Sequence, residues 1–326
     1  MIKLGIRVSS NNNFGLGHFY RCLSIREQLN TKVLWFLDSK NKSIENLVPS
    51  RDKIYYEKDK HNVFLTKKEA KNNTINIILI DTYSIKQKNI LELSDIIPVA
   101  VFVDSKNKIK SQIVICPHPI KLIGIKTEVL LSGIKYAPIL KKFNKKQKKI
   151  KNKKIKILIS MGAYDSKGIT LKAIKAIERL SLNIDFDVTV VIGEKSPIIN
   201  KIKNLIINFK KFKLLVAVKD MNLIYNINDI AVGAPGLSQF ERAYKGLPSV
   251  IISQNNMHKD ILNNWIRLGC AIKANNSIRS IENAIYKLVT NKVLRNKIQT
   301  NCLNAVDGKG SDRIANELKK YVSVND

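Results

Sequence analysis

A series of short apolar runs, rich in β-branched residues, constrains the fold more than any other feature of the chain. Runs of this length are typical of parallel strands that helices cover on both faces. The predicted strands span residues 2–8, 32–38, 75–81, 98–104, 112–117, 155–160, 187–193, 212–218, 229–233 and 248–253. Helical patterns lie between them, as at residues 167–180, and from about Ser277 onward. The sequence therefore predicts an α/β protein with doubly wound parallel sheets.

A lysine-rich segment divides this pattern in two. Residues 141–154 hold nine lysines in fourteen positions, and such a run repels itself and cannot bury a face. We therefore predict two Rossmann-like domains, residues 1–145 and 146–326, that face one another across a cleft. The final helix is expected to reach back to the first domain.

The net charge of +31 raises the question of an anionic partner. Lysine is spread along the whole chain, and basic residues do not alternate with aromatic ones, so we expect no nucleic-acid partner. A weak attraction to the inner membrane surface is consistent with the charge.

Other sequence signals point to the cytoplasm and away from metal chemistry. No apolar run reaches the roughly eighteen residues that span a bilayer, and no leader pattern opens the chain. The four cysteines, which form no CxxC pair, predict buried or inert thiols. We expect a cytoplasmic monomer without metal or cofactor.

Near the start of the chain, glycines lead directly into a histidine within NNNFGLGHFYRCLSIREQL, residues 11–29. Gly15 and Gly17 free the backbone for a tight turn. The apolar residues that follow have helical spacing: Phe19, Cys22, Leu23, Ile25 and Leu29. His18 is thus predicted where a loop after a strand becomes a helix, a common place for catalysis and phosphate binding. The alternative is a helix cap or a semi-buried histidine with its bonds satisfied.

A second candidate site lies after the predicted strand 229–233. Gly236 ends a loop, and the helix predicted at residues 237–244 begins with Leu237 and carries Ser238 in its first turn. The N–H groups at such a helix start, with the Ser238 hydroxyl, suit a pyrophosphate. Glu241 lies one turn later and could bind two ribose hydroxyls. The alternative for Glu241 is a solvated residue paired with a neighbouring cation.

Two further loops in the second half are weaker candidates. Gly162 precedes a helix and is as typical of an ordinary turn as of a nucleotide-binding loop. Asn255 follows a strand, and its amide suits a sugar or a base, although polar loops are common in so asparagine-rich a chain. His61, His118 and His258 have no comparable setting and are expected to be structural or surface residues.

Six motifs in order carry a family resemblance over almost the whole chain. They are GLGHFYR (residues 15–21), LIDTY (79–83), LLSGIKYAPI (130–139), SMGAYDSKGIT (160–170), APGLSQFERAYKGLPSVII (234–252) and VDGKGSDRI (306–314). Together they resemble the UDP-2,4-diacetamido-2,4,6-trideoxy-β-L-altropyranose hydrolases of pseudaminic acid biosynthesis, which have the two-domain glycosyltransferase-B (GT-B) fold.

The resemblance implies an enzyme that hydrolyses a UDP-sugar to UDP and the free sugar, with inversion and without a metal. His18 would be the general base, in a first domain that binds the sugar. Sugar-binding roles are implied for Gly17, Arg21, Tyr83 and Asn255. In the second domain, nucleotide-binding roles are implied for Gly162, Gly236, Leu237, Ser238 and Glu241.

The chain departs from the family pattern at three positions. Ser9 stands where the family has an aspartate, so the resemblance implies that a carboxylate near His18 is missing. Tyr164 replaces a small residue, and Asn256 stands where glutamine is common. Two alternatives follow: a GT-B glycosyltransferase whose His18 deprotonates an acceptor hydroxyl, and a nucleotide-sugar binding protein that has lost catalysis.

Overall fold

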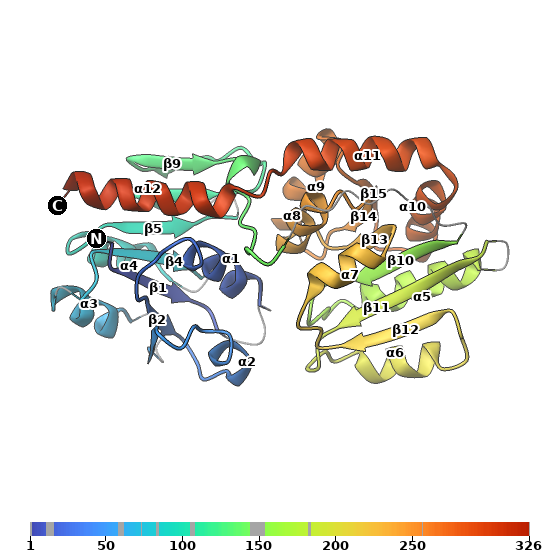
Figure 1. Ribbon diagram of the computed structural model, residues 1–326, viewed down its shortest axis with the longest axis horizontal. Coiled ribbons are helices and arrows are strands. Elements are labelled where there is room, and N and C mark those ends of the chain that lie inside the picture. Colours follow the sequence, from blue (N-terminus) through green and yellow to red (C-terminus); the bar gives the residue numbers. More distant parts are fainter. Residues whose placement is uncertain are drawn as a thin grey trace. The chain divides into compact units, whose positions relative to one another are not determined.

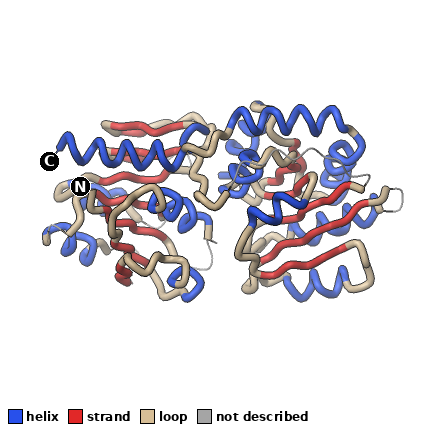
Figure 2. The backbone as a smooth tube through the Cα atoms, in the orientation of Figure 1, coloured by secondary structure: helices blue, strands red, loops and turns tan. Residues whose placement is uncertain are grey.

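The chain folds into two compact units, one of Met1–Lys141 with Gly308–Asp326 and one of Lys142–Asp307. The structure is a computed structural model, and each unit is a parallel sheet covered by helices (Figures 1 and 2). The residues that it describes are 2–10, 16–57, 62–72, 74–82, 85–104, 108–143, 154–181, 184–255 and 257–325. The predicted α/β architecture is confirmed.

The first unit contains a seven-stranded parallel sheet in the order β3-β2-β1-β4-β5-β7-β9. Its strands are β1 (Leu4–Val8), β2 (Leu34–Leu37), β3 (Lys53–Tyr56), β4 (Ile77–Asp81), β5 (Val99–Phe102), β7 (Ile113–Cys116) and β9 (Val129–Ser132). A separate parallel pair consists of β6 (Ile109–Lys110) and β8 (Ile125–Lys126). The helices are α1 (Gly17–Arg26), α2 (Lys42–Glu45), α3 (Phe64–Lys71), α4 (Gln87–Ser94) and α12 (Gly310–Asn325).

The second unit contains a six-stranded parallel sheet in the order β12-β11-β10-β13-β14-β15. Its strands are β10 (Ile155–Ser160), β11 (Phe186–Ile192), β12 (Phe212–Val216), β13 (Ile230–Gly233), β14 (Ser249–Ile252) and β15 (Ile272–Ala274). Its helices are α5 (Ile169–Leu180), α6 (Ile199–Ile206), α7 (Met221–Ile227), α8 (Leu237–Tyr244), α9 (Met257–Arg267), α10 (Ile278–Thr290) and α11 (Lys292–Ala305).

The strands that the sequence pattern predicted are the central, buried ones and one edge strand of the second sheet, β12, which is partly exposed. Every residue of β1, β4 and β7 is buried, as expected for strands covered on both faces. The strands β3 and β9 lie at the edges of the first sheet, and β15 lies at an edge of the second. These edge strands are partly exposed and carry polar residues, which explains why an apolar pattern does not detect them.

The C-terminal segment differs from the predicted division at residue 145. The helix α12 belongs to the first unit, and Figure 1 shows it, in red, beside the strands of that unit. The Ser311 hydroxyl donates to Ser24 Oγ of α1 at 2.8 Å and accepts from the Ile139 N–H at 3.1 Å. A Cβ at Gly310 would lie 2.1 Å from the Ala137 carbonyl oxygen, so only glycine permits this approach. Two residues of the VDGKGSDRI motif, Gly310 and Ser311, therefore hold the start of α12 against the rest of the first unit.

Three further features bear on the predictions from composition. All four cysteines are buried and free. Throughout the described ranges, no helix is both long and apolar enough to cross a bilayer. Among the same residues, no cluster of three or more histidine, cysteine or acidic side chains is arranged to hold a metal ion. Most of the lysine-rich segment, residues 144–153, lies outside the described residues.

Candidate functional site

Each sheet has one point where the strand order reverses. In the first unit this point lies between β1 and β4, and in the second it lies between β10 and β13. At such a switch point the two connections leave in opposite directions, which opens a crevice at the carboxyl ends of the strands. The crevice is the usual ligand site of a doubly wound sheet, so we describe the residues at both points.

In the first unit, the predicted base is paired with an aspartate. His18 is the second residue of α1, which follows β1, and Asp81 is the last residue of β4. The Nδ1 atom of His18 lies 2.5 Å from Asp81 Oδ1, and both side chains are buried. The family resemblance implied that a carboxylate near His18 was missing, because Ser9 stands where an aspartate is expected. Asp81 supplies such a carboxylate from β4.

The charge on Asp81 fixes which nitrogen of His18 carries a proton. Burial alone would raise the pKa of Asp81, but Arg21 and His18 outweigh burial and hold it below its ordinary value. An ionised carboxylate only accepts hydrogen bonds, so the Nδ1 of His18 must be the donor. In the neutral imidazole this places the proton on Nδ1 and leaves Nε2 as the acceptor.

Arg21 links this pair to a second one. Its guanidinium bonds Asp81 through Nε and Nη2, and its Nη1 donates to Asp104 Oδ1 at 2.7 Å. Asp104 in turn lies 3.4 Å from Nε2 of His118. Arg21 also lies 4.5 Å from the centre of the Phe102 ring, a cation–π distance.

Arg21 is thus held inside a buried network, which limits its predicted contact with a sugar. His118, which was expected to be a structural or surface residue, belongs to the same network. Its only sequence signal was its place after β7, at the same sheet edge as Asp81 and Asp104.

Gly17, directly before His18, differs from the prediction. Gly17 is the first residue of α1 and has no left-handed backbone conformation, so a tight turn does not explain it. A Cβ there would have no atom within 4 Å, so the described residues leave open space beside it. Gly15 lies outside the described residues, as does Tyr83, a predicted sugar-binding residue.

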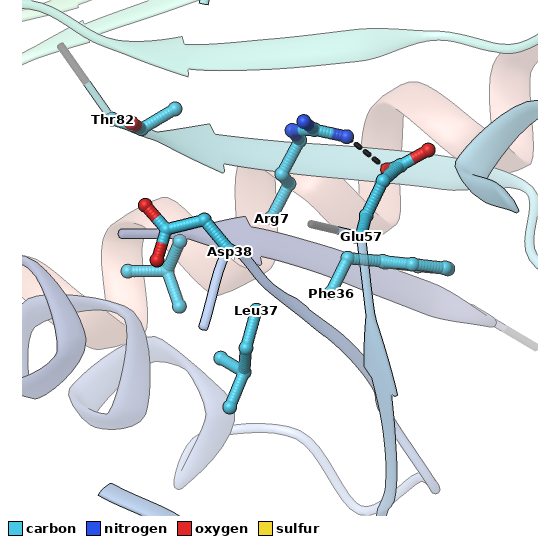
Figure 3. Close-up of a pocket in the computed structure, with 7 residues that line it drawn as sticks. Arg7, Phe36, Leu37, Asp38, Glu57 and Thr82 are labelled. Carbon is cyan, nitrogen blue, oxygen red and sulfur yellow. Dashed lines mark hydrogen bonds and ion pairs between the residues drawn. The ribbon is translucent and has the colours of Figure 1, made fainter. Parts of the chain in front are cut away.

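A second carboxylate, Asp38, organises the loop after β1. It accepts from Ser9 Oγ at 2.9 Å and from the Ser10 N–H and hydroxyl at 2.9 and 2.7 Å. Figure 3 shows it at a small cavity with Arg7, whose guanidinium points to Glu57 and forms an ion pair with it. Ser9 and Ser10 therefore serve as donors to Asp38.

In the second unit, the predicted helix start matches α8, Leu237–Tyr244. Gly236 precedes it, and among the described residues no side chain caps its N–H groups. Gly236, Leu237 and Ser238 are partly exposed, so these donors can be reached from solvent. The start of α8 is thus open to an anion.

Glu241 is held in place by a tyrosine rather than by a neighbouring cation. The Tyr225 hydroxyl, from α7, donates to Glu241 Oε2 at 2.9 Å, and Tyr225 also shares a hydrogen bond with Ser238. Burial raises the pKa of Glu241 to about 7, against the opposing hydrogen bond from Tyr225. Glu241 is partly exposed, but its hydrogen-bond partner is Tyr225 and not the neighbouring cation of the predicted alternative. Ser238 and Glu241 lie together, as predicted.

The helix start after Gly162 is already occupied. The carboxylate of Asp165 accepts from the N–H groups of Ile169 and Thr170 at 3.1 and 2.7 Å, which caps α5 from within the chain. Gly162 has a φ of 98°, a conformation that favours glycine and indicates a turn. This loop lies beside the switch point, but its helix is not free to bind a phosphate.

The Asn255 loop contacts the Gly162 loop through a neighbour. Gln254 Nε2 donates to the Met161 carbonyl at 2.6 Å, which ties the ends of β10 and β14 together. Asn255 itself is exposed in the second unit. Gly17 and Arg21 lie in the first unit, so the predicted sugar-binding residues are divided between the two units.

Two glycines beside α8 give opposite predictions. A Cβ at Gly233 would lie 2.5 Å from Arg242 Nη1 and 2.8 Å from the Ser160 carbonyl, so Gly233→Ala should lower stability by about 2 kcal/mol. A Cβ at Gly236 would meet no atom within 4 Å, so Gly236→Ala should keep the native melting temperature. It should weaken the binding of an anion such as pyrophosphate at the helix start about tenfold, because the methyl group obstructs that position. Thermal melting and calorimetry of both variants check this, and loss of stability in Gly236→Ala would contradict it.

No known protein-family profile matches the chain. Uncharacterized protein MJ1062 of Methanocaldococcus jannaschii is 24% identical over 288 residues, 82% of this chain and 58% of that protein. Spore coat polysaccharide biosynthesis protein SpsG of Bacillus subtilis is 24% identical over 162 residues, 48% of each protein. The chain thus spans about half the length of these curated relatives.

Solved structures match nearly the whole chain. MurG of Acinetobacter baumannii has a TM-score of 0.72 at 14% identity, over 98% of this chain and 99% of that one. HepE of Anabaena, in complex with UDP and glucose, has a TM-score of 0.67 at 12% identity, over 98% and 100%. The fold is that of the GT-B glycosyltransferases. It has two Rossmann-like domains, as the sequence pattern predicted.

Proposed function

We propose that the protein hydrolyses a UDP-activated diacetamido-trideoxy sugar, UDP-2,4-diacetamido-2,4,6-trideoxy-β-L-altropyranose, to UDP and the free sugar. The observation that carries the proposal is the buried His18–Asp81 pair at the switch point of the first sheet. The open start of α8 in the second unit and the solved UDP complex of similar fold support a UDP-sugar as the substrate.

The proposed reaction needs a single base. Nε2 of His18 takes a proton from water as the water oxygen bonds to the anomeric carbon, and the bond from that carbon to the UDP oxygen breaks. Asp81 stabilises the imidazolium that forms, through the Nδ1–H bond. UDP leaves as a stable anion, so no acid has to protonate it. Attack opposite the leaving group inverts the anomeric carbon.

The second unit has a binding role in this proposal. The N–H groups at the start of α8 and the Ser238 hydroxyl bind the diphosphate as its charge develops. Glu241, oriented by Tyr225, accepts the ribose hydroxyls. Asn255 contacts the sugar, and Gly162 shapes the nucleotide-binding edge.

A glycosyltransferase is the second candidate, because the fold is shared with enzymes described as glycosyltransferases. The same His18 would then deprotonate an acceptor hydroxyl instead of water. The assay without an acceptor separates these chemistries.

The test is UDP release from the diacetamido-trideoxy UDP-sugar and from UDP-N-acetylglucosamine, without an acceptor and with EDTA present. Rapid release from the first substrate, and slow release from the second, is the expected result. UDP binding without release from either substrate would contradict hydrolysis and favour a transferase or a binding protein.

The pKa of Glu241 predicts how UDP binding depends on pH. Only the ionised carboxylate can accept from two ribose hydroxyls, and that form becomes dominant as the pH rises through about 7. The affinity for UDP should therefore rise between pH 6 and 8, by roughly three- to tenfold. Glu241→Gln should remove this part of the pH dependence. Because the phosphate of UDP also titrates near pH 6, the variant gives the baseline, and identical pH profiles would contradict the prediction.

A further inference from the structure

We propose that Asp104 and His118 are positioning residues that set the proton affinity and orientation of His18 through Arg21. The proposal rests on the proposed function only in treating His18 as the base. Neither residue bonds His18 directly in the contacts described above, and both belong to the buried network at the carboxyl edge of the sheet.

The first step is that one guanidinium serves two carboxylates. Arg21 donates to Asp81 through Nε and Nη2 and to Asp104 through Nη1. All three side chains are buried, with exposed fractions of 6%, 1% and 8% for Arg21, Asp81 and Asp104. Water therefore screens these charges little. The two carboxylates share one guanidinium, so a stronger interaction of Arg21 with one of them weakens its electrostatic effect on the other.

The second step connects this sharing to His18. Arg21 Nη2 lies 3.2 Å from His18 Nδ1, because both nitrogens donate to Asp81 Oδ1. A cation at this distance opposes protonation of the imidazole, whereas Asp81 favours it. Asp104 neutralises part of the Arg21 charge. The effect of Asp81, which favours protonation of the His18 imidazole, is then stronger than the opposing effect of Arg21. The base is thereby kept able to accept a proton from water.

The third step gives His118 a role of the opposite sign. Its Nε2 lies 3.4 Å from the Asp104 oxygen that Arg21 bonds. When it is protonated, His118 competes with Arg21 for that oxygen and weakens the effect of Asp104 on the guanidinium. His118 therefore changes how strongly Asp104 interacts with Arg21, and through Arg21 it changes the electrostatic environment of His18.

Other charged and titratable groups at the network are accounted for. Cys22 lies on α1 with its Sγ 3.7 Å from Asp81, and Cys116 ends β7. Burial raises the pKa of both thiols, so both remain neutral. The helix α12 meets α1 through Ser311 and Ser24, which are uncharged. The charged and titratable groups at this network thus include Asp81, Arg21, Asp104 and His118.

The test is an NMR titration of the histidine rings in the full chain, with labelled histidines and with His18 assigned from His18→Gln. In Asp104→Asn the titration midpoint of His18 should fall by roughly one pH unit, because the unshared Arg21 charge then opposes protonation. His118→Gln keeps a hydrogen-bond donor but loses the titrating charge, so the midpoint should rise by a smaller amount.

Asp52→Asn is the matched control. Asp52 is a buried carboxylate of the same unit, and it pairs with Arg26 at the other end of α1. Its loss should lower stability without moving the His18 midpoint. An unchanged midpoint in Asp104→Asn would overturn the proposal, as would shifts of the same sign in both network variants. If Asp104→Asn does not fold, His118→Gln decides: a rise supports the proposal and no change overturns it.

The titration requires no turnover, so its outcome is independent of the proposed function. Where the enzyme is active, the acidic limb of its pH–rate profile should move with the midpoint. A shifted midpoint in a protein that releases no UDP would reject the hydrolase function and support the positioning role of Asp104 and His118. Active hydrolysis with an unchanged midpoint would support the hydrolase function and reject the positioning role.

Discussion

Replacement of His18 by alanine is expected to lower the rate of UDP release by about 10³-fold. The variant lacks the only group that the proposed mechanism uses to take the proton of water. The helix start of α8 lies in the other unit, so the affinity for UDP should be unchanged. Single-turnover UDP release and calorimetry with UDP measure the two effects separately.

A conservative variant sharpens this test. His18→Gln keeps a polar side chain of similar length that can still donate to Asp81, but its amide is not a base. It should be as slow as alanine and more stable, because the buried Asp81 keeps a partner. Retention of more than about a tenth of the native rate by either variant would place the base elsewhere.

Asp81→Asn is expected to lower the rate by roughly 10²- to 10³-fold, the second largest effect. An amide at this position can present its NH₂ group to His18, and Nδ1 would then accept rather than donate. The proton would move to Nε2, and the nitrogen that faces the water could no longer act as a base. Nitrogen chemical shifts of the His18 ring report this change of tautomer directly.

Stability needs a control in this experiment, because Asp81 also bonds Arg21. Removal of one partner from a buried ion pair typically costs about 3 kcal/mol or more. Asp52→Asn breaks a comparable buried pair with Arg26 and should cost a similar amount of stability while the rate stays within about threefold of the native value. Equal loss of rate in both variants would mean that Asp81 acts through folding alone.

The network explains why a histidine and two aspartates can share a buried place without a metal ligand set. Asp81 and Asp104 bring two negative charges, and Arg21 supplies a cation between them. Burial would raise the pKa of Asp104, but Arg21 and His118 hold it well below the ordinary value. The arrangement therefore places the His18 imidazole next to an ionised carboxylate at the carboxyl ends of the strands.

Local sequence patterns determined most of the fold. The central strands are continuous apolar runs because both of their faces are buried, and the helix of residues 237–244 follows from a glycine loop and apolar periodicity. Within that helix, Ser238 and Glu241 lie three residues apart, so their meeting on one face needed only helical geometry. His18 was placed at a helix start for the same reason.

Only the tertiary structure decided the partners of His18. Asp81 lies 63 residues away and Asp104 lies 83 residues from Arg21, yet the parallel strands bring their carboxyl ends to one edge. The predicted strands 75–81 and 98–104 end at these two aspartates. A strand pattern does not specify strand order, however, and strand order decides which ends are neighbours. The return of the final helix to the first unit was expected from the sequence, but the contact that holds α12 there, a close approach at Gly310, joins distant segments that no local period encodes.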